Sequence, residues 1–202
     1  MRSFIIRALI LTLTLFNSNF IHGVNPSSYL VPRYKVGDYA QGGVIFFVTP
    51  DGNHGLVASI EDISSSVAWG DLAETIGATA NYLGFGKNFI TAGKENTTKI
   101  VDKYPNETYA ANLCNNYSVS LNGMTYEDWY LPCLLELGLM MTMRETIESV
   151  SQAHGGDPFE DRPYWSSFEA FSSVACTHSF GDAGQYNEVK DDNFRVRAVR
   201  AF

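Results

Sequence analysis

The chain has 202 residues, with 14 Lys and Arg against 22 Asp and Glu, and a formal net charge of −8. Hydrophobic residues make up 45% and charged residues 18%, so the chain has enough apolar area to fold and too little charge density to stay disordered. Three Cys are too few for a disulfide-rich scaffold. The acidic balance argues against nucleic acid as a partner, because neutralising phosphates needs Lys and Arg. One domain is expected at this length.

The N-terminal segment 1–23 is typical of a secretory signal peptide. Arg2 and Arg7 precede an apolar run over 8–16, and the segment has no acidic residue. This run is about half of the roughly 20 residues that cross a bilayer, so no permanent membrane span is expected. We place cleavage after Gly23, which would leave a secreted or periplasmic chain with a charge of −10.

A β-hairpin is predicted after an extended lead-in over 24–33. Two apolar runs, at 42–48 and 55–60, flank a turn over 49–54 that is rich in Pro, Asp, Gly and Asn. The first run is apolar at both alternating sets of positions, which is typical of a central strand buried on both faces. Residues 61–93 show no firm pattern and are expected to form a loop.

Helices are predicted over 94–103, 106–117 and 133–147. The third has the strongest pattern, because apolar residues recur at every fourth position from Leu135 to Ile147. Its Met side chains would also suit an adaptable binding groove, but a place in the core is the favoured interpretation.

Three further runs, at 164–168, 174–180 and 194–202, are predicted to be strands. The last run alternates, and the side chains expected to lie mostly outside are those of Arg195, Arg197 and Arg200. Strands at both ends with helices between them indicate an α+β fold. We expect an antiparallel sheet, two or three helices, and N- and C-terminal strands that lie adjacent.

Several short segments occur in a fixed order along the chain: Gly-Gly-Val-Ile-Phe-Phe-Val at 42–48, Asn-His-Gly-Leu-Val-Ala at 53–58, Trp-Gly at 69–70, Gly-Lys-Glu-Asn-Thr at 93–97, Ala-Ala-Asn-Leu-Cys at 110–114, Asp-Trp-Tyr-Leu-Pro at 128–132, Tyr-Trp-Ser-Ser at 164–167 and Arg-Val-Arg-Ala-Val-Arg at 195–200. Together they resemble the DUF1566 family over residues 34–202. The resemblance implies a bacterial exported protein with a C-type-lectin-like domain.

One member of that family is the C-terminal domain of a bacterial collagen-like adhesin that binds sulphated glycosaminoglycans. Avid binding of such a polyanion would need a basic surface, and a collagen-like stalk would need a Gly-x-y repeat. This acidic chain has neither feature. The resemblance therefore implies the scaffold and not the polyanion ligand.

An enzymatic function is not expected. The sequence has no Gly-x-Ser-x-Gly elbow, His-Glu-x-x-His motif, phosphate loop or Cys-x-x-Cys pair. Cys176 and His178 share one face of a predicted strand, but residues two apart lie about 6 to 7 Å apart at the backbone. A catalytic dyad is therefore not expected there.

Two acid-rich loops offer oxygen ligands of the kind that Ca²⁺ prefers. The first contains His154, Asp157, Glu160 and Asp161. The second is the candidate metal site that we favour, and it consists of Asp182, Glu188, Asp191, Asp192 and Asn193. Because neither loop has EF-hand spacing, we expect no cofactor, with Ca²⁺ as the alternative.

Aromatic residues fall into two groups. The three tryptophans are expected to be buried, and these are Trp69, Trp129 and Trp165. An exposed ring on which a sugar could stack is predicted among three loop residues, Tyr126, Tyr130 and Phe171.

Cys114 and Cys176 stand where related domains often have Cys, so the resemblance implies a disulfide between them. Two buried free thiols are the alternative.

The sequence therefore predicts an exported, non-enzymatic binding domain that recognises a carbohydrate or a host or envelope protein surface, as an adhesin does. The alternative is a structural component that forms homo-oligomers without a small-molecule ligand. An exposed apolar patch and the lack of a pocket would favour that alternative.

Overall fold

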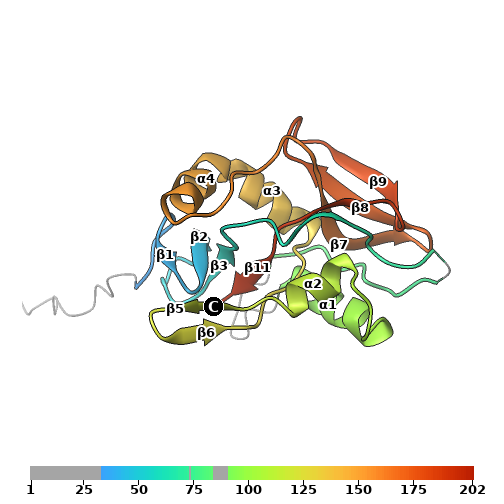
Figure 1. Cartoon of the computed structure of the whole chain (residues 1–202), viewed down its shortest axis with the longest axis horizontal. Helices are drawn as coiled ribbons and strands as arrows, with labels where there is room; N and C mark the ends of the chain where they lie inside the picture. The colour runs from blue at the N-terminus through green and yellow to red at the C-terminus, as the bar shows by residue number, and fades with distance from the viewer. Residues whose placement is uncertain (1–32, 73, 84–90) are drawn as a thin grey trace, which may run out of the picture. The chain divides into compact units, whose positions relative to one another are not determined.

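The computed structural model describes residues 33–72, 74–83 and 91–202 (Figure 1). These residues belong to one compact unit that spans Val31–Phe202. The predicted signal peptide and nearly all of the lead-in lie outside the described residues. In the part that is described, no helix has the length and apolar character needed to cross a membrane.

The predicted hairpin forms the centre of the first sheet. This sheet contains β1 (Tyr39–Ala40), β2 (Gly43–Val48), β3 (Gly55–Ala58) and β11 (Val199–Ala201), in the order β1-β2-β3-β11. All neighbours in it are antiparallel. The C-terminal strand β11 pairs directly with β3, so the expected adjacency of the N- and C-terminal strands is confirmed.

A second sheet has the order β4-β10-β7-β8-β9. Its strands are β4 (Ser64–Val67), β10 (Phe194–Val196), β7 (Pro163–Phe171), β8 (Val174–Ser179) and β9 (Gln185–Val189). Strand β10 runs parallel to β7, and the other pairs are antiparallel. A small hairpin of β5 (Val119–Leu121) and β6 (Met124–Tyr126) stands apart. The mixed α+β class is confirmed, but a single antiparallel sheet is wrong.

The prediction of one strand over 194–202 is also wrong. The chain leaves the second sheet after β10 and enters the first sheet at β11, so the arginine between them lies where both faces are covered. Arg197 is fully buried, with its guanidinium 4.4 Å from the centre of the Phe159 ring. The alternating pattern predicted an exposed side chain for Arg197, because alternation is typical of a strand with one face in solvent. Here neither face of the chain at Arg197 is exposed.

The described residues contain four α-helices rather than two or three: α1 (Ala92–Lys103), α2 (Ala110–Asn115), α3 (Leu134–Thr142) and α4 (Arg144–Ala153). The predicted helix over 133–147 is interrupted at Met143. The next residue, Arg144, donates hydrogen bonds to the carbonyls of Phe159 and Phe180 and to Glu148, which fixes the start of α4 against the neighbouring loop. In α3 the buried apolar side chains are Leu134, Leu137 and Met140, whereas Leu135 is exposed.

Strand β2 separates two clusters of buried side chains. Ile45 belongs to one cluster together with Ile100 of α1, whereas Val44 and Phe46 belong to the other together with Leu137 of α3. In Figure 1, α1 and α2 lie on one side of the strands and α3 and α4 on the other. The predicted burial of both faces of β2 is confirmed, and so is the burial of all three tryptophans.

Side chains of the Gly-Lys-Glu-Asn-Thr segment attach α1 to the loop that precedes it and to the Asp-Trp-Tyr-Leu-Pro segment. The Asn96 side chain donates to the Ala80 carbonyl at 2.8 Å and accepts from the Ala80 amide at 3.0 Å. Thr97 Oγ1 accepts from the Leu131 amide at 3.0 Å. Side chains of the Gly-Lys-Glu-Asn-Thr segment thus hold α1 against the Trp-Tyr-Leu-Pro segment, and they serve the scaffold.

Candidate functional site

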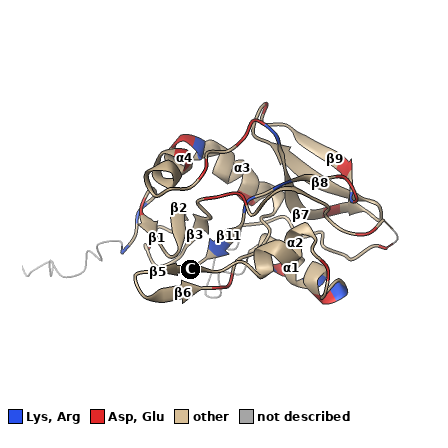
Figure 2. Ribbon diagram, in the orientation of Figure 1, with Lys and Arg blue, Asp and Glu red and all other residues tan. Residues whose placement is uncertain are grey.

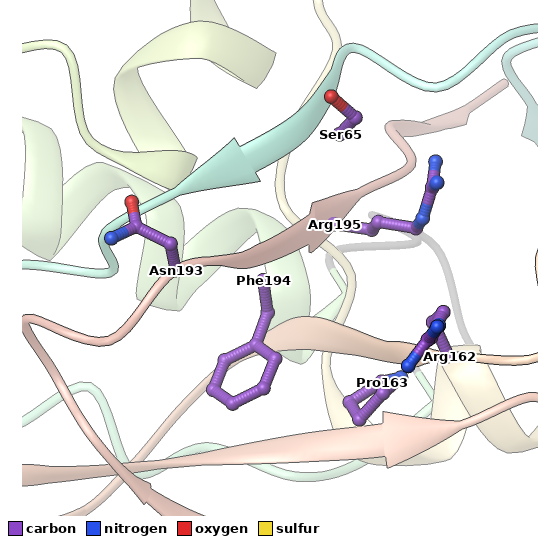
Figure 3. Close-up of a pocket in the computed structure, with 6 residues that line it drawn as sticks. All are labelled: Ser65, Arg162, Pro163, Asn193, Phe194 and Arg195. Atoms are coloured by element: carbon purple, nitrogen blue, oxygen red, sulfur yellow. The ribbon is translucent and has the colours of Figure 1, made fainter.

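Two pockets that share residues lie beside the edge strand β4. One, which we call the arginine pocket, has a volume of about 280 Å³ and is lined by Ser65, Arg162, Pro163, Asn193, Phe194 and Arg195 (Figure 3). The other, the acidic pocket, has a volume of about 460 Å³ and is lined by Asp62, Ile63, Ser64, Ser65, Asp157, Pro158, Glu160 and Arg195. Because Ser65 and Arg195 line both pockets, we treat them as one β4 groove.

The irregular pairing of β10 places Arg195 in this groove. Phe194 lies opposite Val67 of β4 and Val196 lies opposite Ser64, so the register shifts between these two pairs. Such irregularities bend a strand locally and turn a side chain away from the regular ladder. On the other side of β10, Arg195 lies opposite Tyr164 of β7.

Asp62 anchors the two arginines that flank Val196. Its Oδ2 accepts hydrogen bonds from Arg195 Nη1 at 2.9 Å and from Tyr164 Oη at 3.0 Å. Its Oδ1 lies 3.2 Å from Arg197 Nε, an ion pair without hydrogen-bond geometry. Arg197 also donates to the carbonyl of Asp157 at 2.9 Å. These contacts fix the floor of the acidic pocket.

Burial dominates the electrostatics of this anchor. It raises the pKa of the Asp62 carboxyl above its usual range, against the attraction of Arg197 and the hydrogen bonds from Tyr164 and Arg195. It also lowers the pKa of the Arg197 guanidinium, which the charge of Asp62 opposes. Both pKa shifts have the same cause, because removing a charged group from water is unfavourable. The charge of each partner therefore stabilises the charge of the other.

Arg162 contributes a guanidinium that the protein itself leaves available. The residue is exposed, and within the described ranges its side chain makes no hydrogen bond or ion pair. Arg195 is different, because its side chain is only 25% exposed and one nitrogen is bound to Asp62. In Figure 3 both arginines lie on one side of the arginine pocket and Asn193 lies on the other, with Phe194 between them.

Elsewhere the basic residues are dispersed. Figure 2 shows Lys and Arg distributed among the helices, the loops and strand β11, and none of the described strands or helices is lined by them along its length. The groove therefore combines donors, a carboxylate and an aromatic ring, which is an arrangement that can bind a polar ligand.

The three predicted stacking residues lie outside the groove. Tyr130 is buried, and its hydroxyl donates to Glu136 at 2.9 Å, so its prediction as an exposed platform is wrong. Tyr126 is half-buried, and the Arg200 guanidinium covers its ring at 4.8 Å. Phe171, at the end of β7, is 66% exposed and is available for contact.

The predicted metal residues are not brought together. Asp182 lies before β9 and is already bound by the Tyr186 hydroxyl at 2.6 Å and the Gly184 amide at 3.0 Å, which lower its pKa to about 2. Glu188 lies within β9, and Asp191, Asp192 and Asn193 follow that strand. Among the residues that the structure describes, no three His, Cys, Asp or Glu side chains form a group that could hold a metal ion.

The first acid-rich loop is spread in the same way. Asp161 pairs with Arg144 at 2.8 Å, the His154 ring stacks on Tyr39 at 3.8 Å, and Asp157 and Glu160 line the acidic pocket. Asp161 and His154 are thus engaged away from Asp157 and Glu160, and the described residues of this loop form no group of three possible metal ligands.

The cysteines are free and buried, so the implied disulfide between Cys114 and Cys176 is not formed. Cys114 lies within α2 and belongs to a core cluster, and burial raises its pKa. Cys176 on β8 donates to the Asn187 side chain of β9 at 3.0 Å. The two thiols have different surroundings, which fits the alternative of buried free cysteines.

His178 on β8 is buried, and neither of its ring nitrogens has a hydrogen-bond partner in the described chain. Burial lowers its pKa below 6.5, against a weaker effect of Asp182. The folded state therefore binds this proton less tightly than the unfolded state, and the resulting stability is lost as the pH falls below 6.5.

We accordingly expect the free energy of unfolding to fall less between pH 7.5 and pH 5.5 in His178→Phe than in the native chain. Phe keeps a ring beside Phe180, which packs edge to face on His178 at 5.9 Å. Urea unfolding at both pH values measures the difference. An equal fall of the free energy of unfolding in both proteins would contradict the prediction. Cys176→Ser is the control for a substitution on the same strand.

The main functional candidates, Arg162 and Arg195, were not identified as binding residues from the sequence. The alternation of 194–202 correctly indicated that Arg195 has an outward side, but no periodicity marks Arg162 in its polar loop. The sequence offered Asn193, Asp157 and Glu160 only as candidate Ca²⁺ ligands, and all three line the groove.

Comparison with known proteins adds no relative. No family model matches the chain, and no curated protein matches it.

Proposed function

We propose that the chain is an exported bacterial binding domain of the DUF1566 type, with a C-type-lectin-like fold and no enzymatic activity. The proposal is that it recognises a carbohydrate through the β4 groove, in the manner of an adhesin. The observation that carries it is the chemistry of the arginine pocket, where two guanidiniums, an amide and a hydroxyl surround an aromatic ring.

Such a lining suits a sugar. Amide, hydroxyl and guanidinium groups can each bond a sugar hydroxyl, and an aromatic ring provides the apolar contact that sugar C–H faces need. The volume of about 280 Å³ lies at the lower limit of small-molecule sites, which suits one or two sugar units.

A pair of substitutions on β4 tests the proposal. Successive residues of a strand face opposite sides, so Ser65→Tyr fills the groove while Ser66→Tyr adds the same ring on the other side. Both serines are exposed, and both variants should fold. On a glycan array, with and without Ca²⁺, we expect the native protein and Ser66→Tyr to bind the same glycans and Ser65→Tyr to lose them.

Loss of binding in Ser66→Tyr alone would place the site elsewhere, and the absence of any glycan ligand for the native protein would overturn the proposal. In that case the structural alternative gains support. Phe171 and Val189 are exposed at 66% and 42%, and both lie beside Val174 in the second sheet. Light scattering would then show an oligomer that depends on concentration and is lost in Phe171→Ser.

A further inference from the structure

We infer that the saccharide bound in the β4 groove carries one carboxylate, which Arg162 and Arg195 hold at one side of the arginine pocket. The inference rests on the proposed function and adds the charge of the ligand to it. It follows from how each guanidinium is engaged, from what lies opposite them, and from the acids in the neighbouring pocket.

Arg162 provides the unpaired positive charge. Its guanidinium borders the arginine pocket and has no hydrogen bond or ion pair within the described chain. A planar guanidinium offers two parallel N–H donors that match the two oxygens of a carboxylate. A neutral sugar would leave this charge without a counterpart in the complex.

Arg195 provides donors that are already positioned. Only its Nη1 is engaged, in the 2.9 Å hydrogen bond to Asp62, so Nε and Nη2 make no hydrogen bond among the described residues. Asp62 in turn is fixed by the Tyr164 hydroxyl at 3.0 Å. Asp62 is shared between Arg195 and Arg197, whereas Arg162 has no counter-charge among the described residues, so Arg162 supplies the positive charge that one carboxylate would balance.

The remaining lining suits the rest of an acidic sugar. In Figure 3 Asn193 lies opposite the arginines and the Phe194 ring lies between, and Ser65 reaches from β4 above them. A sugar whose carboxylate lies at the arginines would place its ring near Phe194 and its hydroxyls near Asn193. The pocket volume of about 280 Å³ suits such a unit.

The acidic pocket opposes a second negative charge. A longer ligand continues past Arg195 into a space lined by Asp62, Asp157 and Glu160. Asp157 and Glu160 are both exposed, and neither carboxylate has an ion pair within the described ranges. A polymer with an anionic group on every unit would meet these acids, so the groove favours one carboxylate followed by neutral sugars.

Isothermal titration with matched probes tests the inference. The acidic probes are 3′-sialyllactose and methyl glucuronoside, and their neutral counterparts are lactose and methyl glucoside; heparin represents a polyanion. We expect the native protein to prefer at least one acidic probe over its counterpart by about tenfold, as the loss of one charge-assisted contact implies. Heparin should bind less tightly than that probe.

Arg162→Gln should abolish the preference, so that the acidic probe binds no more tightly than its neutral counterpart. Lys35→Gln is the matched control, because it removes one exposed positive charge before β1 and outside both pockets, and it should keep the preference. Unfolding in urea confirms that both variants fold as the native protein does.

Equal affinity for acidic and neutral probes would overturn the inference and leave the proposed function in place, as would a preference that survives in Arg162→Gln. Tighter binding of heparin would also overturn it. If none of the saccharides binds the native protein and the glycan array is negative too, the proposed function itself fails.

Discussion

Replacing Glu169 by Gln should destabilise the protein by about 3 to 5 kcal/mol, because it leaves the charge of Lys190 buried without a partner. Lys190 Nζ lies 2.6 Å from Glu169 Oε1, and the two side chains are 0% and 1% exposed. The ammonium also donates to the Glu74 carbonyl at 3.1 Å and lies 4.8 Å from the centre of the Trp69 ring. These contacts cannot replace the lost negative charge.

Glu169 also holds a loop in place. Its carboxylate accepts from the amides of Ile76 at 2.9 Å and Gly77 at 2.7 Å, so the substitution weakens the attachment of this loop to β7. Burial alone would raise the pKa of Glu169, but the hydrogen bonds from Lys190 and the two amides hold it below 4.5. The folded carboxylate therefore binds its proton less tightly, and its stabilisation is present above pH 4.5 and lost as the pH falls below it.

Urea unfolding at pH 7 measures the loss of stability in Glu169→Gln. A double-mutant cycle shows whether this loss arises from the pair of Glu169 and Lys190. Lys190→Met should cost a similar amount, whereas Glu169→Gln combined with Lys190→Met should cost much less than the two singles added together, because no isolated charge remains buried. Additive losses, or a loss of less than about 1 kcal/mol for Glu169→Gln, would show that the pair does not act as a unit.

Replacing Asp62 by Asn should cost about 3 to 5 kcal/mol for a related reason, because the fully buried Arg197 then lacks a counter-charge. Asn can still accept the hydrogen bond from Tyr164, so the loss reports the ion pairs with Arg195 and Arg197.

Asp157→Asn is the matched control for this experiment. It removes the same charge from the same pocket, but only the backbone carbonyl of Asp157 contacts Arg197. Its cost should stay within about 0.5 kcal/mol, as is usual at exposed positions. Chemical unfolding of both variants separates the two effects, and equal costs would refute the role assigned to the Asp62 carboxylate.

Local patterns predicted much of the fold. The two apolar runs around a Pro-Asp-Gly turn became β2 and β3, and the apolar character of both sides of 42–48 correctly indicated burial on two faces. These features depend on neighbours in the sequence. The helix over 133–147 was only partly right, because the contacts of Arg144 with Phe159 and Phe180 are distant in the sequence and no local pattern encodes the interruption at Met143.

The groove could not be predicted in this way. It is lined by residues near 62–65, 157–163 and 193–195, which meet only because β10 inserts between β4 and β7. Asp157 and Asn193 were predicted as possible metal ligands, because the carboxylate and amide oxygens of such loops suit Ca²⁺. What distinguishes a binding groove from a solvated loop is which side chains already have partners, and that depends on the fold.

By itself, the sequence determined the acidic charge, the α+β class, the hairpin at the start of the domain and the burial of the three tryptophans. These properties follow from composition and from periodicity within single elements. The tertiary structure alone decided that the C-terminal arginines have different environments: Arg197 is buried against Asp62 and Phe159, whereas Arg195 borders a groove. The physical reason is that the chain changes sheets between β10 and β11, so solvent access along this segment is set by distant strands and not by its own alternation.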